Sequence, residues 1–292
     1  MVKKLKVSVI IVNYNTIRHL VPCLNSIYSQ TRNIDFEVIV VDNNSQDESV
    51  KVLEESFTTI HLIRSEKNLG FGSANNVGAN QAKGKYLLFL NPDTLLENNA
   101  LKCFYDWMET YNQKEDYGAI GPFLLDENRV FVTPFDRLPR MTTLIRNEFS
   151  FITNWLHKKE KIEIFEKDVE HICGAAIFLP KRLFETLGGF DPQFFLYYEE
   201  TDLLYRIQKK GLKVRKITTP EIIHLEGKSF QENNAKRILL EDSKFKYFRK
   251  HYRGWKVSVF KYIYLMLRIL KSINRKYSLS DNIRYFSSIF KA

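Results

Sequence analysis

The sequence predicts an α/β fold in which a mostly parallel central sheet carries helices on both faces. In the first half of the chain, short apolar segments alternate with segments whose apolar residues recur at helical spacing. The short segments are apolar at nearly every position, which is typical of parallel strands buried on both sides. At 292 residues, with 44% hydrophobic and 27% charged residues, the chain has the composition of a globular protein of one or two domains.

Four strands and three helices are expected in the first half. The strands are residues 6–14, 36–42, 59–64 and 85–90. The helices are residues 17–30, 45–57 and 73–84. Ser45 is the expected N-cap of the second helix, since acids follow it in the first turn, and Gly84 is expected to close the third.

The second half has a more mixed pattern. Residues 117–125 and 169–180 are expected as strands. Residues 181–190 are expected as a short helix stopped by two glycines, and residues 199–211 as a helix that begins with acids and ends with lysines and Gly211. Residues 125–170 show no clear pattern, and a mobile loop is one interpretation of this stretch.

The excess positive charge lies at the C-terminal end. Residues 236–292 hold fifteen Lys and Arg against three acids, a balance of +12, whereas residues 1–235 carry −2 of the chain's net +10. We therefore expect a domain over residues 1–235 and a basic, amphipathic helical extension over residues 236–292. The asymmetry indicates an anionic surface as the partner of the extension.

Residues 254–277 are apolar and aromatic as well as basic. Such a helix can lie in an anionic membrane interface, and the alternative is a helix packed on the domain or in a homodimer. No nucleic-acid-binding motif accompanies the charge, so we expect no nucleic acid. The basic residues that flank or interrupt the apolar run are Lys261, Arg268, Lys271, Arg275 and Lys276.

Other global features agree with a cytoplasmic protein. No charge-free stretch of about 18 residues occurs, so we expect no transmembrane helix. Cys23, Cys103 and Cys173 are too scattered for a zinc site and are expected to be core residues in a reducing compartment. We therefore predict a cytoplasmic protein that is peripheral on the inner face of the cell membrane.

Polar residues follow three of the predicted strands. The strand ends read Asn13-Tyr14-Asn15, Asp42 with the "NNS" after it, and Asn91-Pro92-Asp93. Ligands of open α/β sheets bind beyond the carboxyl ends of the strands, so these ends predict one shared crevice. Asp42 can accept a hydrogen bond from a base or a ribose hydroxyl there, or it can cap the following helix.

The loop "NLGFGSANN" presents Gly70 and Gly72 before a helix. Its backbone N–H groups can face phosphates. The pattern lacks the third glycine of a dinucleotide fingerprint and follows the third strand, which counts against a dehydrogenase.

Two further acidic constellations have a structural and a functional interpretation. Asp93 suits Mg²⁺ or Mn²⁺ when a diphosphate is the co-ligand, but "NPD" alone is more often a turn. Glu199, Glu200 and Asp202 either stabilise a helix N-terminus or supply a general base beside an aromatic wall that includes Tyr197. His224 ends another apolar run, where a core or surface histidine is the default interpretation.

Taken together in this order, the segments resemble a known family. "VSVIIVNYN", "CLNSIYSQ", "EVIVVDNNSQDES", "NLGFGSANNVG", "LLFLNPDT", "GAAIFLPKRLFETLGGFD" and "FFLYYEETDLLYRIQKKG" cover about residues 6–229. They are similar to the inverting family 2 glycosyltransferases of the GT-A fold, and most of all to the bacterial rhamnosyltransferase-like branch. Each motif alone is weak, whereas the ordered set is specific.

The resemblance implies a role for each matching position. It implies Glu200 as the general base, Asp93 and His224 at the metal and diphosphate, and Glu199, Asp202 and Tyr197 on the acceptor side. Two departures are Asn91, which occupies the first DxD position without a charge, and Glu200, which replaces the family's aspartate. The residues implied to hold the nucleotide sugar are Asn13, Tyr14, Asp42, Asn68, Gly70 and Asn91.

The implied activity is transfer of a sugar from a nucleotide-diphospho-sugar, dTDP-rhamnose or a UDP-sugar, in bacterial surface polysaccharide assembly. The acceptor is a hydroxyl of a glycan or lipid-linked molecule, the anomeric centre inverts, and the cofactor is Mg²⁺ or Mn²⁺. The alternative is an inactive sugar-nucleotide-binding or scaffolding relative. A two-carboxylate glycoside hydrolase is disfavoured because it does not need three polar strand ends.

Overall fold

The computed structural model describes residues 5–112, 116–132, 136–149, 164–225, 234–271 and 278–291, and the chain forms two compact units. The first unit holds the described residues of Met1–Arg137, Glu163–Pro192 and Glu199–Gln231. The second holds those of Leu138–Ile162, Gln193–Tyr198 and Glu232–Ala292. The C-terminal extension thus clusters with two segments from earlier in the sequence.

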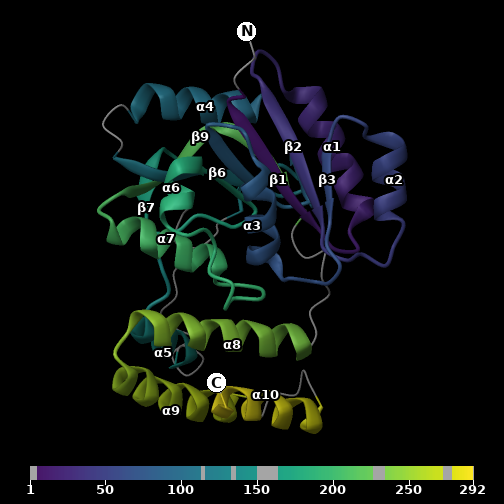
Figure 1. Cartoon of the computed structure of the whole chain (residues 1–292). Helices are drawn as coiled ribbons and strands as arrows, with labels where there is room; N and C mark the ends of the chain where they lie inside the picture. The colour runs from purple at the N-terminus through teal and green to yellow at the C-terminus, as the bar shows by residue number, and fades with distance from the viewer. Residues whose placement is uncertain are drawn as a thin grey trace. The chain divides into compact units, whose positions relative to one another are not determined.

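Nine strands of the described residues form one sheet in the first unit (Figure 1). Its order is β3-β2-β1-β4-β8-β6-β9-β5. Strand β7 pairs with the first residues of β9, and β5 pairs with its last residues. The half β3-β2-β1-β4 is parallel as predicted, and the other half mixes parallel and antiparallel pairs. The strands are β1 Val7–Asn13, β2 Phe36–Asp42, β3 His61–Arg64, β4 Tyr86–Leu90, β5 Thr94–Leu96, β6 Tyr117–Leu125, β7 Lys167–Val169, β8 Ala176–Pro180 and β9 Lys213–His224.

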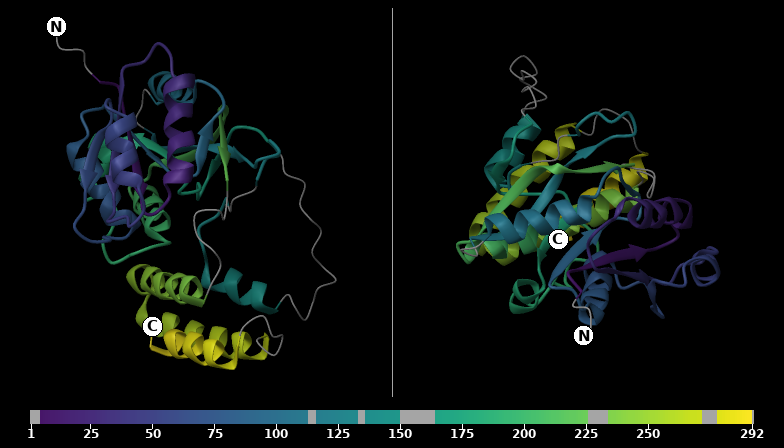
Figure 2. Two further views of the ribbon diagram at one scale, coloured as in Figure 1. Left: turned by 90° about the vertical axis from the view of Figure 1, so that its right-hand side faces the viewer. Right: turned by 90° about the horizontal axis from the view of Figure 1, so that it is seen from above.

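Helices cover both faces of this sheet, which confirms the predicted layering (Figure 2). Alternate residues of β1 point to opposite faces: Val9 lies in the core shared with α1, α2 and α4, and Ile10 in the core shared with α3, α6 and α7. Both are fully buried, which explains the continuous apolar strands. The helices are α1 Ile17–Gln30, α2 Ser49–Ser56, α3 Phe71–Gln81, α4 Ala100–Tyr111, α6 Lys181–Thr186 and α7 Glu199–Lys209.

Several predicted boundaries were wrong. The second helix begins at Ser49, and Ser45 is not its N-cap. The Ser45 hydroxyl instead accepts from Asn13, the last residue of β1, and from the N–H of Asn15. The third helix ends at Gln81, and the N–H of Gly84 donates to Ser8 Oγ at 2.8 Å. The predicted strand 169–180 begins only at Ala176. Elements that we did not predict are α4, α5 (Met141–Phe149), β5, β7 and β9, the last being the strand that ends at His224.

The second unit is helical in its described residues. Helix α5 packs on α9 (Gly254–Lys271), and α10 (Leu279–Lys291) packs on both α8 (Asn234–His251) and α9. Their shared core is mainly aromatic, so the predicted amphipathic helix does bury one of its faces. None of the described helices is both long enough and apolar enough to cross a membrane. The buried core residues are Phe245, Phe248, Val257, Phe260, Tyr264, Leu267, Tyr285 and Ile289.

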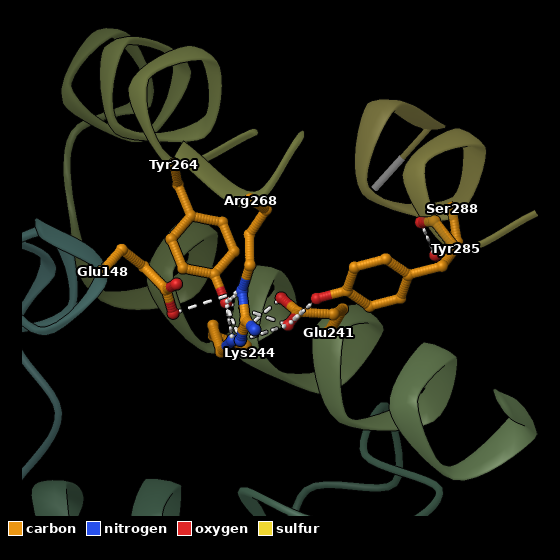
Figure 3. Close-up of polar contacts among 7 residues, drawn as sticks. All are labelled: Glu148, Glu241, Lys244, Tyr264, Arg268, Tyr285 and Ser288. Carbon is orange, nitrogen blue, oxygen red and sulfur yellow. Dashed lines mark hydrogen bonds and ion pairs between the residues drawn. The ribbon is translucent and has the colours of Figure 1, made fainter. Parts of the chain in front are cut away.

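A charged network crosses this core (Figure 3). The carboxylate of Glu241, 2% exposed, accepts from Lys244 Nζ at 2.8 Å, from Tyr264 Oη at 3.0 Å and from Tyr285 Oη at 2.7 Å. Arg268 donates to Tyr264 Oη at 2.8 Å. Burial raises the pKa of Glu241, but the charges and hydrogen bonds of Lys244, Arg268 and Tyr285 bring it below its ordinary value. Glu241 is therefore an ionised anchor between α8, α9 and α10.

Replacing this anchor should loosen the second unit. We expect Glu241→Gln to lower the free energy of unfolding by about 3 kcal/mol, because it leaves buried Lys244 without its counter-charge. Hydrogen exchange of peptides from α8 and α9, with a denaturant titration, measures the effect. Asp242→Asn is the matched control, since Asp242 pairs with Lys246 at a side chain that is 42% exposed, and it should change stability by less than about 0.5 kcal/mol. Equal exchange in the two variants would contradict the anchoring role.

Candidate functional site

The ends of β1 and β2 meet in a buried polar cluster. Parallel pairing sets Asn13 beside Asp42, and Asn13 Nδ2 donates to Asp42 Oδ1 at 2.8 Å and to Ser45 Oγ at 3.0 Å. Asn13 Oδ1 accepts from Thr16 Oγ1 at 2.7 Å, and Asp42 Oδ2 accepts from the N–H of Ser45 at 3.1 Å. Asn13 thus orients Asp42 at the strand ends, and Asp42 closes a turn without capping α2.

A second polar group joins this cluster to the glycine loop. Asn43 Nδ2 donates to Asn68 Oδ1 at 2.9 Å, and Asn43 Oδ1 accepts from the N–H of Leu69 at 2.8 Å. Asn68 Oδ1 also accepts from the N–H of Gly70, whose φ of 80° suits glycine. The loop that starts α3 is therefore held against the end of β2.

The glycine loop also lies close to the acidic pair. A side chain at Gly72 would bring its Cβ within 3.3 Å of Glu199 Cβ, so this position requires the close approach that glycine allows. Tyr14 stands at the end of β1 with 41% of its surface exposed. A cavity of about 470 Å³ opens between the loops after β1 and β2. Its lining residues are Asn15, Thr16, Ile17, Arg18, His19, Asp47 and Glu48.

The segment after β4 is a turn that aims polar groups inward. The carbonyl of Asn91 accepts from Thr94 Oγ1 at 2.8 Å, and its N–H donates to the carbonyl of Ala175 at 2.9 Å. Asn91 Oδ1 is buried and accepts no hydrogen bond from the described residues. A buried amide oxygen in this state is costly, which indicates a ligand-facing group.

Asp93 and His224 come together although 131 positions separate them. The antiparallel pair β5–β9 sets Thr94 opposite His224, and the N–H of Leu225 donates to the carbonyl of Asp93 at 2.9 Å. Asp93 Oδ1 lies 3.4 Å from His224 Nε2, and Asp93 is 2% exposed. Among the described residues, no three His, Cys, Asp or Glu side chains gather to hold a metal ion. The carboxylate of Asp93 and the imidazole of His224 are groups that fit a divalent ion whose other ligands are diphosphate and water oxygens.

Glu200, at the start of α7, faces the same short segment that binds Asn91. Its side chain packs on Gly174, where an added Cβ would lie 3.4 Å from Glu200 Cγ. Glu200 Oε1 lies 3.5 Å from His171 Nε2 and accepts from Thr201 Oγ1 at 3.3 Å. Burial raises the pKa of Glu200, but the hydrogen bond and charge of His171 lower it more, to below its ordinary value. Glu200 is therefore ionised near neutral pH.

Glu199 has the opposite environment. It is 4% exposed, and its Oε2 accepts no hydrogen bond from the described residues. Burial first, and the neighbouring charge of Glu200 second, raise the pKa of Glu199 well above its ordinary value. Of the two adjacent carboxyls, Glu199 is the one that retains a proton, so Glu200 is the one able to accept a proton.

The two other acceptor-side residues are engaged elsewhere. Asp202 is fully buried and accepts from Arg206 Nε at 2.7 Å, while Arg206 also donates to the carbonyls of Leu187 and Gly189. These bonds fix α7 on the turn after α6. Tyr197 belongs to the second unit, where its φ is 70° and Lys236 Nζ lies 6.0 Å from its ring centroid. Contact of either residue with an acceptor stays a prediction, and residues 226–233 after His224 lie outside the described residues.

Sequence reasoning missed three residues of this site. Asn43 and Ser45 stand within the polar ending of β2, but single amides and hydroxyls in a loop carry no distinguishing signal. His171 was not identified as a site residue because residues 169–180 have the composition of one strand. In the structure the N–H groups of Glu170 and His171 instead donate to the carbonyl of Asp136, at 2.8 and 3.1 Å, and leave the strand pattern.

Comparisons with known proteins agree with this geometry. The hexosyltransferase Agl10 of low-salt glycan biosynthesis in Haloferax volcanii is 26% identical over 74% of this chain and 66% of its own length. The N-acetylglucosaminyl-diphospho-decaprenol L-rhamnosyltransferase of Mycobacterium tuberculosis is 24% identical over 85% of both chains. The O-antigen biosynthesis protein RfbC of Myxococcus xanthus is 28% identical over 70% of this chain, but only 16% of its own length is covered.

Solved structures share the fold. The TarS fragment of Staphylococcus aureus has a TM-score of 0.57 at 16% identity, over 98% of this chain and 80% of that one. GalNAc-T7, crystallised with UDP, GalNAc and Mn²⁺, has a TM-score of 0.63 at 18% identity, over 99% of this chain and 55% of that one. The sequence model described as glycosyl transferase family 2 matches residues 8–184. The predicted GT-A fold is therefore confirmed, and the chain belongs to glycosyl transferase family 2.

Proposed function

We propose that this glycosyltransferase moves a sugar from a nucleotide-diphospho-sugar to a hydroxyl of a glycan or lipid-linked acceptor, with inversion, in surface polysaccharide assembly. The donor is dTDP-rhamnose or a UDP-sugar. The similarity to an N-acetylglucosaminyl-diphospho-decaprenol L-rhamnosyltransferase supports rhamnose and a lipid-linked acceptor. UDP in a structure of the same fold supports the second donor class.

One observation carries the proposal: the turn that bears Asn91 and Asp93 and the base meet at one segment. Asn91 binds the carbonyl of Ala175, and Glu200 packs on Gly174. A carboxylate ionised at neutral pH thus lies next to the element that carries Asn91 and Asp93. This arrangement suits a reaction in which a hydroxyl loses its proton on one side of the sugar and a diphosphate leaves on the other.

The chain's own residues divide the task by position. Asp42 and the loop of Asn68 and Gly70 bind the nucleoside, Asn91 orients the diphosphate, and Glu200 takes the proton of the acceptor hydroxyl as that oxygen bonds to the anomeric carbon. Attack from the face opposite the leaving group inverts the centre. Asp93 and His224 would hold the Mg²⁺ or Mn²⁺, which when bound offsets the negative charge of the leaving nucleoside diphosphate.

We also propose that the second unit touches an anionic membrane from the cytoplasmic side. One face of α9 is exposed and apolar, with Trp255 64%, Tyr262 60% and Met266 61% exposed. These positions, with Val259, Ile263, Ile269 and Leu270, recur at helical spacing. Arg253 and Lys256 are exposed at the N-terminal end of this face, whereas Glu241 among the few acids is buried. Apolar side chains bordered by cations suit an anionic lipid surface more than a second copy of an equally basic chain.

If Glu200 is the base, substitutions of the two neighbouring glutamates should differ sharply in their effect on kcat. Glu200→Gln should lower kcat by about 10²- to 10⁴-fold, because the amide cannot accept the acceptor proton. Donor affinity should stay unchanged, as measured by thermal shift with a panel of dTDP- and UDP-sugars in Mn²⁺ or Mg²⁺. Transfer is measured as release of nucleoside diphosphate with an acceptor present.

Glu199→Gln is the matched control for this experiment. Burial and the charge of Glu200 raise the pKa of Glu199 and so favour its uncharged form. An uncharged amide of the same size should therefore keep kcat within about tenfold of the wild type. Equal loss in both variants, or full turnover in Glu200→Gln, would contradict the assignment. Absence of any metal-dependent donor turnover in the wild type would favour the inactive relative.

The membrane contact is tested on the exposed face of α9. The triple variant Tyr262→Ser, Met266→Ser and Leu270→Ser should stop floating with vesicles that contain phosphatidylglycerol, since it removes the apolar surface and keeps the charge. Tyr111→Ser, at an exposed tyrosine of the first unit, is the control and should float normally. Wild-type flotation should weaken in high salt. A triple variant that still floats would contradict the proposal. If instead the wild type ignores lipid and forms a dimer, and the triple variant is a monomer, this face belongs to a homodimer interface.

A further inference from the structure

His171 lies against the carboxylate of Glu200 without having a role in the proposed reaction. Its Nε2 is 3.5 Å from Glu200 Oε1 and 3.3 Å from Thr201 Oγ1, which donates to that same carboxylate oxygen. The side chains of His171 and Glu200 are 13% and 19% exposed. Two polar groups, the imidazole of His171 and the hydroxyl of Thr201, thus converge on one oxygen of Glu200 in a partly closed environment.

The segment that carries His171 is tied to the helix that carries Glu200. Gln208 of α7 donates from Nε2 to the carbonyl of Glu170 at 2.8 Å, two turns after Glu200. The N–H groups of Glu170 and His171 both donate to the carbonyl of Asp136. On the other side of His171, Gly174 contacts Glu200 directly. The backbone on both sides of the histidine is therefore fixed relative to the carboxylate.

We infer that His171 is a positioning residue for Glu200: with Thr201 it holds Oε1, so that Oε2 receives the proton of the acceptor hydroxyl. This inference rests on the proposed function, in which Glu200 is the base. In the step itself the O–H bond of the acceptor breaks, its oxygen bonds to the anomeric carbon, and the proton bonds to Oε2. His171 does not touch the reacting atoms and takes no proton from the substrate.

The charges around Glu200 agree with this role. The titratable groups that face it are His171, from the segment before β8, and Glu199, from its own helix. Glu199 is the member of the acidic pair whose pKa is raised, by burial and by the charge of Glu200. The hydrogen bond and charge of His171 lower the pKa of Glu200 against the opposing effect of burial. Without the histidine, only Thr201 and the backbone would oppose the effect of burial on the pKa of Glu200. The pKa would rise, and the carboxyl would become harder to ionise.

The experiment compares His171→Leu with His171→Gln in the full-length protein. His171→Leu should lower kcat by about 10- to 100-fold, as expected for an outer partner that orients a reactive group. The KM for the donor should stay unchanged, and the acidic limb of the kcat–pH profile should move to higher pH because Glu200 protonates more readily. His171→Gln keeps an amide N–H near the position of Nε2 and should recover most of kcat, although it brings no charge.

A second background separates this inference from the proposed function. In Glu200→Gln, the further change His171→Leu should leave the residual rate unaltered, because no base remains to be positioned. An unchanged kcat and acidic limb in His171→Leu would overturn the inference while the base assignment survives. Additive losses in the double variant would also overturn it. Normal turnover in Glu200→Gln would instead overturn the proposed function. Should His171→Leu not fold, the pH profile of His171→Gln decides: an acidic limb shifted to higher pH supports the role, and an unshifted limb with unaltered kcat overturns it.

Discussion

The antiparallel pairing of β4 with β8 is the constraint on which the candidate site depends. It sets Leu90 opposite Ala176, and one residue beyond this register Asn91 donates its N–H to the carbonyl of Ala175. Because β4 also pairs in parallel with β1, the same strand links the nucleoside-side cluster to the turn that bears Asp93. The residue before Ala175 is Gly174, on which the Glu200 side chain packs. The register between β4 and β8 therefore positions both the turn that bears Asn91 and the segment that contacts Glu200.

Two adjacent glutamates obtain different protonation states from their surroundings. Burial near Gly72 raises the pKa of Glu199. The neighbouring side chains of His171 and Thr201 lower the pKa of Glu200. The difference does not depend on sequence position or residue type, since both are glutamates at the start of one helix. It follows from which side chains the loop before β8 brings to α7.

Much of the fold, and less of the site, was predictable from the sequence. The parallel half was predictable because its strands are mostly apolar and polar residues stand at or just after the ends of β1, β2 and β4. Gly211, at a φ of 81°, follows the end of α7 as expected. The mixed half was not predictable, because β5 and β7 have only three residues each and obtain their order from pairing with β9. His171 could not be identified because an apolar strand pattern surrounds it, and its role depends on a distance to α7 that no local pattern encodes.

The claim on which the proposed function rests is that the turn after β4 and the start of α7 border one donor site. Diffraction from crystals that contain Mn²⁺ and a nucleoside diphosphate is its sharpest test, through the anomalous signal of the manganese. We expect a peak within coordination distance of the Asp93 carboxylate and His224, with the diphosphate against Asn91 and on the side facing Glu200. The same crystals of Asp93→Asn should lose the peak. A nucleotide bound away from the ends of β1, β2 and β4, or a manganese peak that persists in Asp93→Asn, would contradict the claim.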